Sequence, residues 1–195
     1  MLREVLSSTG WLERTRAFAR ALRMSTKDPG GLMLVGSPDD EPWHLAAHLD
    51  DESRWSAIPE LTPTLVRWAP PADAPAHLRI GLDRLAAARR GETLVVVTEE
   101  AASVPLLERV GDARRTGATI LTLDTGDKEL EGLAHDALVV PPRERLVTFD
   151  GAQHLVSAAA GEPLTRSPAR QQRPGVRTRL ARLLDTISGP SPGRD

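Results

Sequence analysis

The stretch at residues 91–124 constrains the fold of this chain more than any other. An apolar run at residues 94–97, rich in β-branched side chains, is followed by a loop and by a helical pattern that ends at Gly117, and a second apolar run covers residues 120–123. Strands that are almost continuously apolar are typical of a parallel sheet covered on both faces. The stretch therefore predicts a strand–helix–strand unit.

The rest of the chain extends this pattern to five strands. Further apolar runs predict strands at residues 32–35, 64–68 and 137–140. Strands that alternate with helices in this way predict an α/β fold with a three-layer, doubly wound, parallel five-stranded sheet. We expect the helices at residues 3–24, 42–55, 78–90, 104–117, 129–135 and 149–160.

Charge divides the chain into an acidic body and a basic tail. Residues 161–195 carry seven arginines against three acidic residues, a balance of +4, which leaves −6 for residues 1–160. We therefore predict a domain at residues 1–160, followed at residues 161–195 by a flexible Pro/Arg-rich linker and a short basic amphipathic helix at residues 176–187. That helix either folds back onto the acidic body, which we favour, or binds an acidic partner or, weakly, a membrane.

Composition and missing motifs exclude several kinds of function. The chain has no cysteine, so disulfides and thiolate chemistry are excluded, and no apolar run reaches the roughly 18 residues that span a bilayer. The acidic body disfavours nucleic-acid binding. No glycine-rich dinucleotide or P-loop motif occurs, and a receiver domain would need Asp and Lys where Thr98 and Pro141 stand. We expect a cytoplasmic protein without cofactor, nucleic-acid partner or stable membrane insertion.

Three segments resemble the sugar isomerase (SIS) domain family: residues 91–97, residues 113–118 and residues 131–140. The similarity includes the first strand and its turn and covers roughly residues 3–160. It implies a flavodoxin-like strand order, frequent dimers, and binding of phosphosugars or their derivatives. The ligand-binding residues that it implies follow the first, third and fourth strands: Gly36, Ser37, Thr98, Glu99, Glu100, Ser103 and Asp124.

The loop after the third strand departs from the family pattern. Members that bind a phosphosugar commonly carry Ser-x-Ser-Gly-x-Ser/Thr there, whereas residues 98–103 read Thr-Glu-Glu-Ala-Ala-Ser. With the acidic residues 39–41, five carboxylates could surround the crevice at the topological switch point, where each like-charge pair at ~4 Å costs about 4 kcal/mol at an effective dielectric constant of 20. Three interpretations stay open: the acids cap helices and face solvent, which we favour, the crevice takes a cation or an amine-bearing ligand, or a sugar site persists.

Histidines and acids offer weaker catalytic and metal candidates. Isomerisation needs a base near the substrate carbon, and Glu99, Glu100 and His77 are available, but no spacing singles out an acid–base pair. His44 and His48 are spaced i, i+4 on a predicted helix, so both could face one metal ion. A carboxylate ligand would come from a nearby acid: Asp39, Asp50 or Asp51. Exposed or subunit-contact histidines are the interpretation we favour.

These patterns together predict a binding protein. We expect an SIS-like carbohydrate-derivative-binding protein without isomerase activity, a homodimer that acts as a regulator or scaffold. The alternative is an active phosphosugar aldose–ketose isomerase. The residues before the first strand are too few for the helix-turn-helix domain of the family's transcription factors, which disfavours a DNA-binding regulator.

Overall fold

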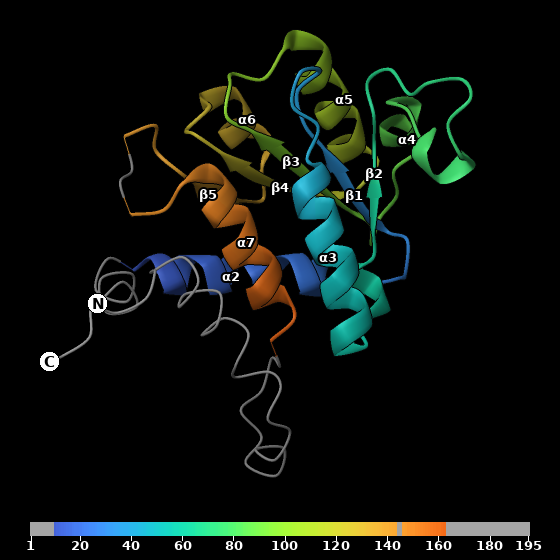
Figure 1. Cartoon of the computed structure of the whole chain (residues 1–195). Helices are drawn as coiled ribbons and strands as arrows, with labels where there is room; N and C mark the ends of the chain where they lie inside the picture. The colour runs from blue at the N-terminus through green and yellow to red at the C-terminus, as the bar shows by residue number, and fades with distance from the viewer. Residues whose placement is uncertain (1–9, 144–145, 163–195) are drawn as a thin grey trace, which may run out of the picture.

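The computed structural model describes residues 10–143 and 146–162. Five parallel strands form one sheet in the order β2-β1-β3-β4-β5 (Figure 1). The strands are β1 (Leu32–Val35), β2 (Pro63–Leu65), β3 (Thr93–Thr98), β4 (Thr119–Asp124) and β5 (Asp136–Val139). The predicted doubly wound sheet and its flavodoxin-like order are confirmed.

Helices cover both faces of the sheet. One face packs against α2 (Trp11–Ser25), α3 (Trp43–Ser56) and α7 (Phe149–Ala160), and the other against α4 (Asp83–Ala86), α5 (Val104–Arg115) and α6 (Lys128–Leu133). Two 3₁₀ turns, η1 (Pro59–Leu61) and η2 (Ala76–Leu78), lie in the connections on either side of β2. Within the described ranges, no helix has the length and apolar character needed to cross a membrane.

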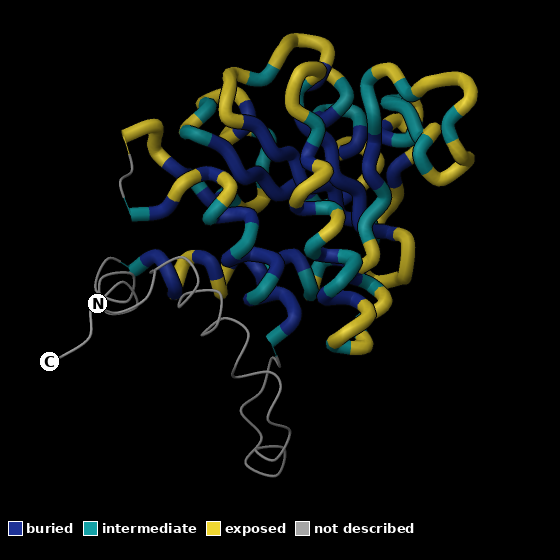
Figure 2. Tube along the Cα trace, viewed as in Figure 1, coloured by how far each residue is buried: buried dark blue, intermediate teal, exposed yellow. Residues whose placement is uncertain are grey.

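Alternate residues of each central strand enter two separate cores. In β3, Val95 and Val97 pack with α2, α3 and α7, whereas Leu94 and Val96 pack with α4, α5 and α6. Every residue of β1 and β3 is buried, and Figure 2 shows the sheet as the buried centre of the molecule. Coverage of both faces explains why these strands are apolar throughout.

The register of the strands brings their carboxyl ends to one edge of the sheet. Val35 of β1 pairs with Val96 of β3, and Thr98 of β3 pairs with Asp124 of β4. The loops that follow β1, β3 and β4 therefore leave the sheet on the same side. Open α/β sheets bind their ligands at this edge, beside the point where the strand order reverses.

The segment between β2 and β3 differs from the prediction. The helix expected at residues 78–90 is reduced to η2 and α4, and the strand expected at residues 64–68 ends at Leu65. Beyond it, Arg67 forms an isolated parallel bridge with Gly81, and its N–H donates to the Ile80 carbonyl oxygen at 2.8 Å. Ile80 and Gly81 thus pair with the segment after β2, and α4 begins only at Asp83.

Further points concern the two ends of the chain and one tryptophan. The N-terminal helix begins at Trp11, and the residues before Gly10 lie outside the described part. The basic helix predicted at residues 176–187 also lies outside the described residues. Trp43 at the start of α3 is 42% exposed, while Leu45 and Leu49 of that helix are buried.

Candidate functional site

The loop after β1 folds back closely on itself at Gly36. Gly36 is buried, and a Cβ atom there would overlap the Asp40 carbonyl oxygen and lie 2.8 Å from Cδ of Pro42. Only glycine permits this approach. The Gly36 carbonyl oxygen accepts a hydrogen bond from Nε1 of Trp68 at 2.9 Å, and Oγ of Ser37 accepts one from the Asp40 N–H at 3.0 Å. The loop is therefore a fixed turn that is bonded to the segment after β2.

Glu41 connects the same two segments. Its Oε2 accepts hydrogen bonds from Nε of Arg67 at 2.8 Å and from Nε1 of Trp43 at 3.1 Å, and its Oε1 accepts one from the Trp68 N–H at 3.2 Å. The Glu41 and Arg67 side chains are only 11% and 18% exposed, so this ion pair is largely removed from water. The Arg67 guanidinium also lies over the Trp43 ring, 4.8 Å from its centroid.

A pocket of about 390 Å³ opens beside this network at the carboxyl ends of β1 and β2. It is lined by residues 38–41, Trp43 and residues 67–69. The volume lies within the range of small-molecule sites. Three carboxylates face one guanidinium, which Glu41 already binds, so the lining carries a formal charge of −2. The pocket is therefore acidic and bears two indole rings.

The loop after β3 uses its own polar groups internally. Oγ1 of Thr98 donates a hydrogen bond to the Glu100 carbonyl oxygen at 2.9 Å and accepts one from the Glu100 N–H at 3.2 Å. The Glu99 carbonyl oxygen accepts a hydrogen bond from Oγ1 of Thr125 at 2.9 Å. The side chains of Glu99 and Glu100 are both exposed. The two exposed acids that distinguish this loop thus lie on a turn that is stabilised by hydrogen bonds between threonine hydroxyls and the backbone.

The carboxylate of Asp127 accepts hydrogen bonds from backbone N–H groups beside this loop. Its Oδ1 accepts from the N–H groups of Glu129 and Leu130, and its Oδ2 accepts from the Ala102 N–H at 2.7 Å. Burial raises the pKa of this carboxyl, but the three N–H groups outweigh burial and hold the pKa below its ordinary value. In addition, Pro105 in the first turn of α5 has no N–H. An anion at this helix start would meet fewer free donors than helix N-termini usually offer.

Asp124, a predicted ligand-binding residue, is buried. Its Oδ1 accepts hydrogen bonds from the N–H groups of Gly126 at 2.6 Å and Asp127 at 3.1 Å. These bonds hold the turn that leads into α6, so the geometry gives Asp124 a structural role.

Of the favoured interpretation, the helix capping is wrong, whereas Asp39, Asp40, Glu99 and Glu100 do face solvent. The N-cap residue is Pro42 in α3 and Ser103 in α5, and neither helix start has a side-chain cap hydrogen bond. The acids at residues 39–41 and 99–100 precede these cap positions. Because Pro42 begins the helical segment, Glu41 stays outside α3 and binds Arg67 instead.

The predicted candidates His44, His48 and His77, and also His135, lie in three different settings. His77 is exposed in η2, and Nδ1 of His135 accepts a hydrogen bond from the Ile120 N–H at 2.9 Å. His44 and His48 lie on α3, where their rings contact the ring of His154 on α7. His154 was not among the predicted residues, because no pattern in a single sequence tells which helices will pack side by side.

Comparisons with known proteins identify the fold. Neither a protein-family model nor a curated protein sequence matches the chain. A provisionally assigned phosphosugar isomerase from Silicibacter pomeroyi DSS-3 superimposes with a TM-score of 0.57 and 15% identity, over 96% of this chain and 52% of that one. The Vibrio vulnificus NanR protein, solved in complex with ManNAc-6P, does so with a TM-score of 0.52 and 14% identity, over 93% of this chain and 64% of that one.

The similarity to both solved proteins is one of fold. The chain spans 52% and 64% of the two solved proteins, and the identities are low. The comparison therefore establishes the fold, and the resemblance to the sugar isomerase family is confirmed as a shared architecture.

Proposed function

We propose that this chain is an SIS-like carbohydrate-derivative-binding protein that lacks isomerase activity and acts as a regulator or scaffold. The pocket at the carboxyl ends of β1 and β2 carries the proposal, because it joins two indole rings to three carboxylates around a space of about 390 Å³. Indole rings offer apolar faces to the C–H faces of a sugar ring, and carboxylates accept hydrogen bonds from hydroxyl or ammonium groups. The shared fold with NanR, solved with ManNAc-6P, supports a sugar derivative as the ligand class.

The negative charge of the pocket favours a neutral or amine-bearing sugar over a sugar that binds through a phosphate group. Asp39 and Asp40 are exposed at the rim, and Arg67, the cation among the lining residues, is bound to Glu41. A phosphate would need an unpaired cation or free backbone donors. Near the other loop, the Ala102 N–H is already bound by Asp127. An ammonium group would instead gain from the surrounding carboxylates.

The position of the candidate catalytic residues supports a binding role. Glu99, Glu100 and His77 are exposed, and the residues that line the pocket do not include them. General acid–base catalysis needs a proton-transfer group within hydrogen-bond reach of the reacting carbon. We therefore propose that a sugar bound in this pocket is held without being isomerised.

A binding panel with two matched variants tests the proposal. Isothermal titration of neutral sugars, amino sugars and sugar phosphates into the full chain should detect a neutral or amino sugar. Trp43→Ala should weaken that binding by at least about tenfold, because aromatic side chains contribute much of the binding free energy in small-molecule sites. Trp55→Ala removes another exposed tryptophan of α3 that lies outside the pocket lining and should leave the affinity unchanged.

The isomerase alternative predicts the opposite pattern. Glucose, fructose or arabinose phosphates would bind most tightly and would be interconverted, and Glu99→Ala would abolish turnover. That result would overturn the binding proposal, as would a panel in which no sugar binds. The homodimer, the cytoplasmic location and an acidic partner for residues 176–187 stay predictions.

A further inference from the structure

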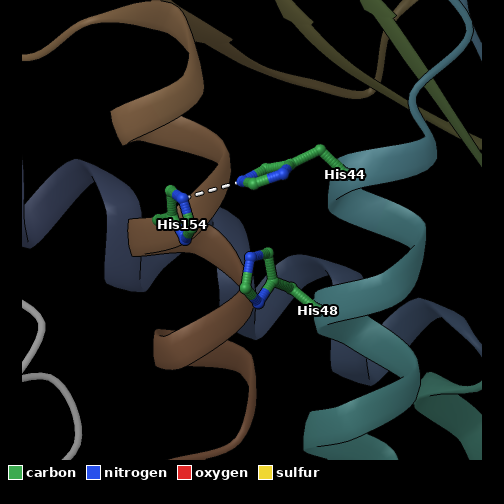
Figure 3. Close-up of side chains that lie close together, drawn as sticks. All are labelled: His44, His48 and His154. Atoms are coloured by element: carbon green, nitrogen blue, oxygen red, sulfur yellow. Dashed lines mark hydrogen bonds between the residues drawn. The ribbon is translucent and has the colours of Figure 1, made fainter.

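Three imidazole rings meet between α3 and α7. His44 and His48 project from α3 and His154 projects from α7, so that the three rings face one another across the helix pair (Figure 3). The ring centroids lie 4.6 Å apart for His44–His48, 4.4 Å for His44–His154 and 4.3 Å for His48–His154. The cluster joins residues that are 110 positions apart in the sequence.

The packing of the two helices sets this geometry. His44 and His48 are four residues apart and therefore lie on one face of α3. Leu45 and Leu49 of α3 belong to the same buried core as apolar residues of α7, which fixes the two helices side by side. The histidines sit at the outer margin of this contact, with His44 exposed and the other two partly buried. The core thus holds the rings together while one side stays open to solvent.

As a hydrogen-bond network, the cluster is incomplete. The Nε2 atoms of His44 and His154 lie 2.7 Å apart, so one must carry a proton and the other must not. The second ring nitrogen of His154, Nδ1, is buried and has no hydrogen-bond partner among the described residues. A buried polar atom without a hydrogen-bond partner lowers the stability of the fold. The three imidazoles do not satisfy one another's hydrogen bonds as a carboxylate partner would.

We propose that His44, His48 and His154 bind a divalent late first-row transition-metal ion, with Zn²⁺ as the preferred occupant. One ligand nitrogen from each residue lies within 4.8 Å of the other two. Tetrahedral zinc with Zn–N bonds of 2.0–2.1 Å places its nitrogens about 3.3 Å apart, so small side-chain rotations suffice. Imidazole nitrogens select this class of metal over Mg²⁺ and Ca²⁺, which prefer oxygen ligands.

The site differs from the sequence-based metal hypothesis in its third ligand. A carboxylate from Asp39, Asp50 or Asp51 was expected, but the cluster of ligand atoms contains none of them. Asp50 forms an ion pair with Arg54, and Asp39 lines the acidic pocket. The structure supplies His154 instead. A set of three histidines leaves a fourth position for water or for an oxygen of another molecule. None of the three lines the acidic pocket, so the metal proposal does not depend on the sugar proposal.

Metal titration of the tag-free full chain tests the site. After treatment with EDTA and desalting, isothermal titration with ZnCl₂ should give one equivalent per chain. Co²⁺ should produce the intense visible absorption of a tetrahedral nitrogen-ligated ion, and MgCl₂ should not displace it. His154→Ala and His48→Ala should each lower the zinc affinity by at least about tenfold, because even the loss of an outer-sphere contact typically costs that much. His77→Ala, which removes an exposed histidine of η2, should change nothing.

Folding controls keep the result decisive. Far-ultraviolet circular dichroism should show that each variant is folded, and His44→Gln serves as a second variant because His44 is exposed and tolerates substitution. Loss of one equivalent of zinc in folded His154→Ala and His44→Gln supports the site. Substoichiometric binding by the unsubstituted chain overturns it, and so does unchanged affinity in these two variants.

Discussion

The carboxylate of Asp127 accepts a hydrogen bond from the backbone N–H of Ala102 at a donor–acceptor distance of 2.7 Å. The start of α6 is thereby joined to the loop that precedes α5. The same side chain caps α6 through Glu129 and Leu130. One residue therefore stabilises a helix start and also occupies a donor at the edge of the sheet where ligands bind in this fold.

Asp127→Ala should lower the free energy of unfolding by about 1–3 kcal/mol. The substitution removes a helix cap, worth about 1 kcal/mol, and leaves the Ala102 N–H without its partner. Urea unfolding followed by circular dichroism measures the effect. Glu129→Ala, an exposed acid two residues further along, should stay within about 0.5 kcal/mol. Equal losses in the two variants would contradict the assigned role.

The contribution of Asp127 should also depend on pH. Three N–H groups outweigh the effect of burial, so the pKa of its carboxyl is lower in the folded chain than the ordinary 3.8. In the acid range the unfolded chain therefore binds more protons than the folded chain. The stabilisation by Asp127 is complete at pH values above the ordinary pKa, and it is lost as the pH falls through the lower pKa of the folded chain. The difference in unfolding free energy between the unsubstituted chain and Asp127→Asn should therefore shrink from pH 6 to pH 2. A difference that grows in this direction would refute the assignment.

Breaking the Glu41–Arg67 pair should destabilise the pocket wall. Glu41→Ala is expected to lower the free energy of unfolding by about 2–4 kcal/mol, because it leaves a largely desolvated guanidinium unpaired. Asp39→Ala, an exposed residue of the same loop, should cost less than about 0.5 kcal/mol. In a double-mutant cycle, Arg67→Ala should cost about 1–3 kcal/mol less when Glu41 is already absent. Additive losses would show that the two side chains are not coupled.

Gly36→Ala should unfold more easily and lose sugar binding. Its methyl group would overlap the Asp40 carbonyl oxygen, and displacing this turn should cost about 1–3 kcal/mol. Gly111→Ala is the matched control, because nothing lies within 4 Å of a Cβ atom at that position of α5. In a helix interior, alanine is favoured over glycine by about 0.5–1 kcal/mol, so this variant should be more stable. Thermal unfolding of both variants distinguishes a local clash from a general effect of the substitution.

Zinc should raise the thermal stability of the chain through the histidine cluster. At a free concentration of 100 times the dissociation constant, a ligand of the folded state contributes about 2.7 kcal/mol. For a domain of this size the melting temperature should rise by about 5–10 °C. Differential scanning calorimetry with zinc and with EDTA measures the shift. His154→Ala should abolish it, and His77→Ala should retain it. A shift of equal size in both variants would place the metal elsewhere.

The sequence predicted the sheet well because its signals are local. The apolar runs at β1, β3 and β4 are continuous or nearly so, and burial on both faces of a parallel sheet favours this pattern. The helix predicted at residues 78–90 failed because a tertiary contact, the pairing of residues 80–81 with Arg67, overrode the local periodicity.

The candidate sites were less predictable, because they depend on contacts between distant segments. Glu41 was read as a possible helix cap, and nothing in the sequence indicated that it would bind Arg67. Likewise, the i, i+4 spacing located two histidines of the cluster, but the third comes from α7. Which helices become neighbours is decided by how the cores pack, and a single sequence does not record it.

The position of α7 has a consequence for how the chain is made. All five strands, together with α2 and α3, are synthesised before α7, yet α7 packs against both of those helices and shares their core. Until α7 is in place, the apolar side chains that it covers lack part of their packing, and exposed apolar surface of this kind promotes aggregation and chaperone binding. This core can therefore be completed only after the last described helix has been translated.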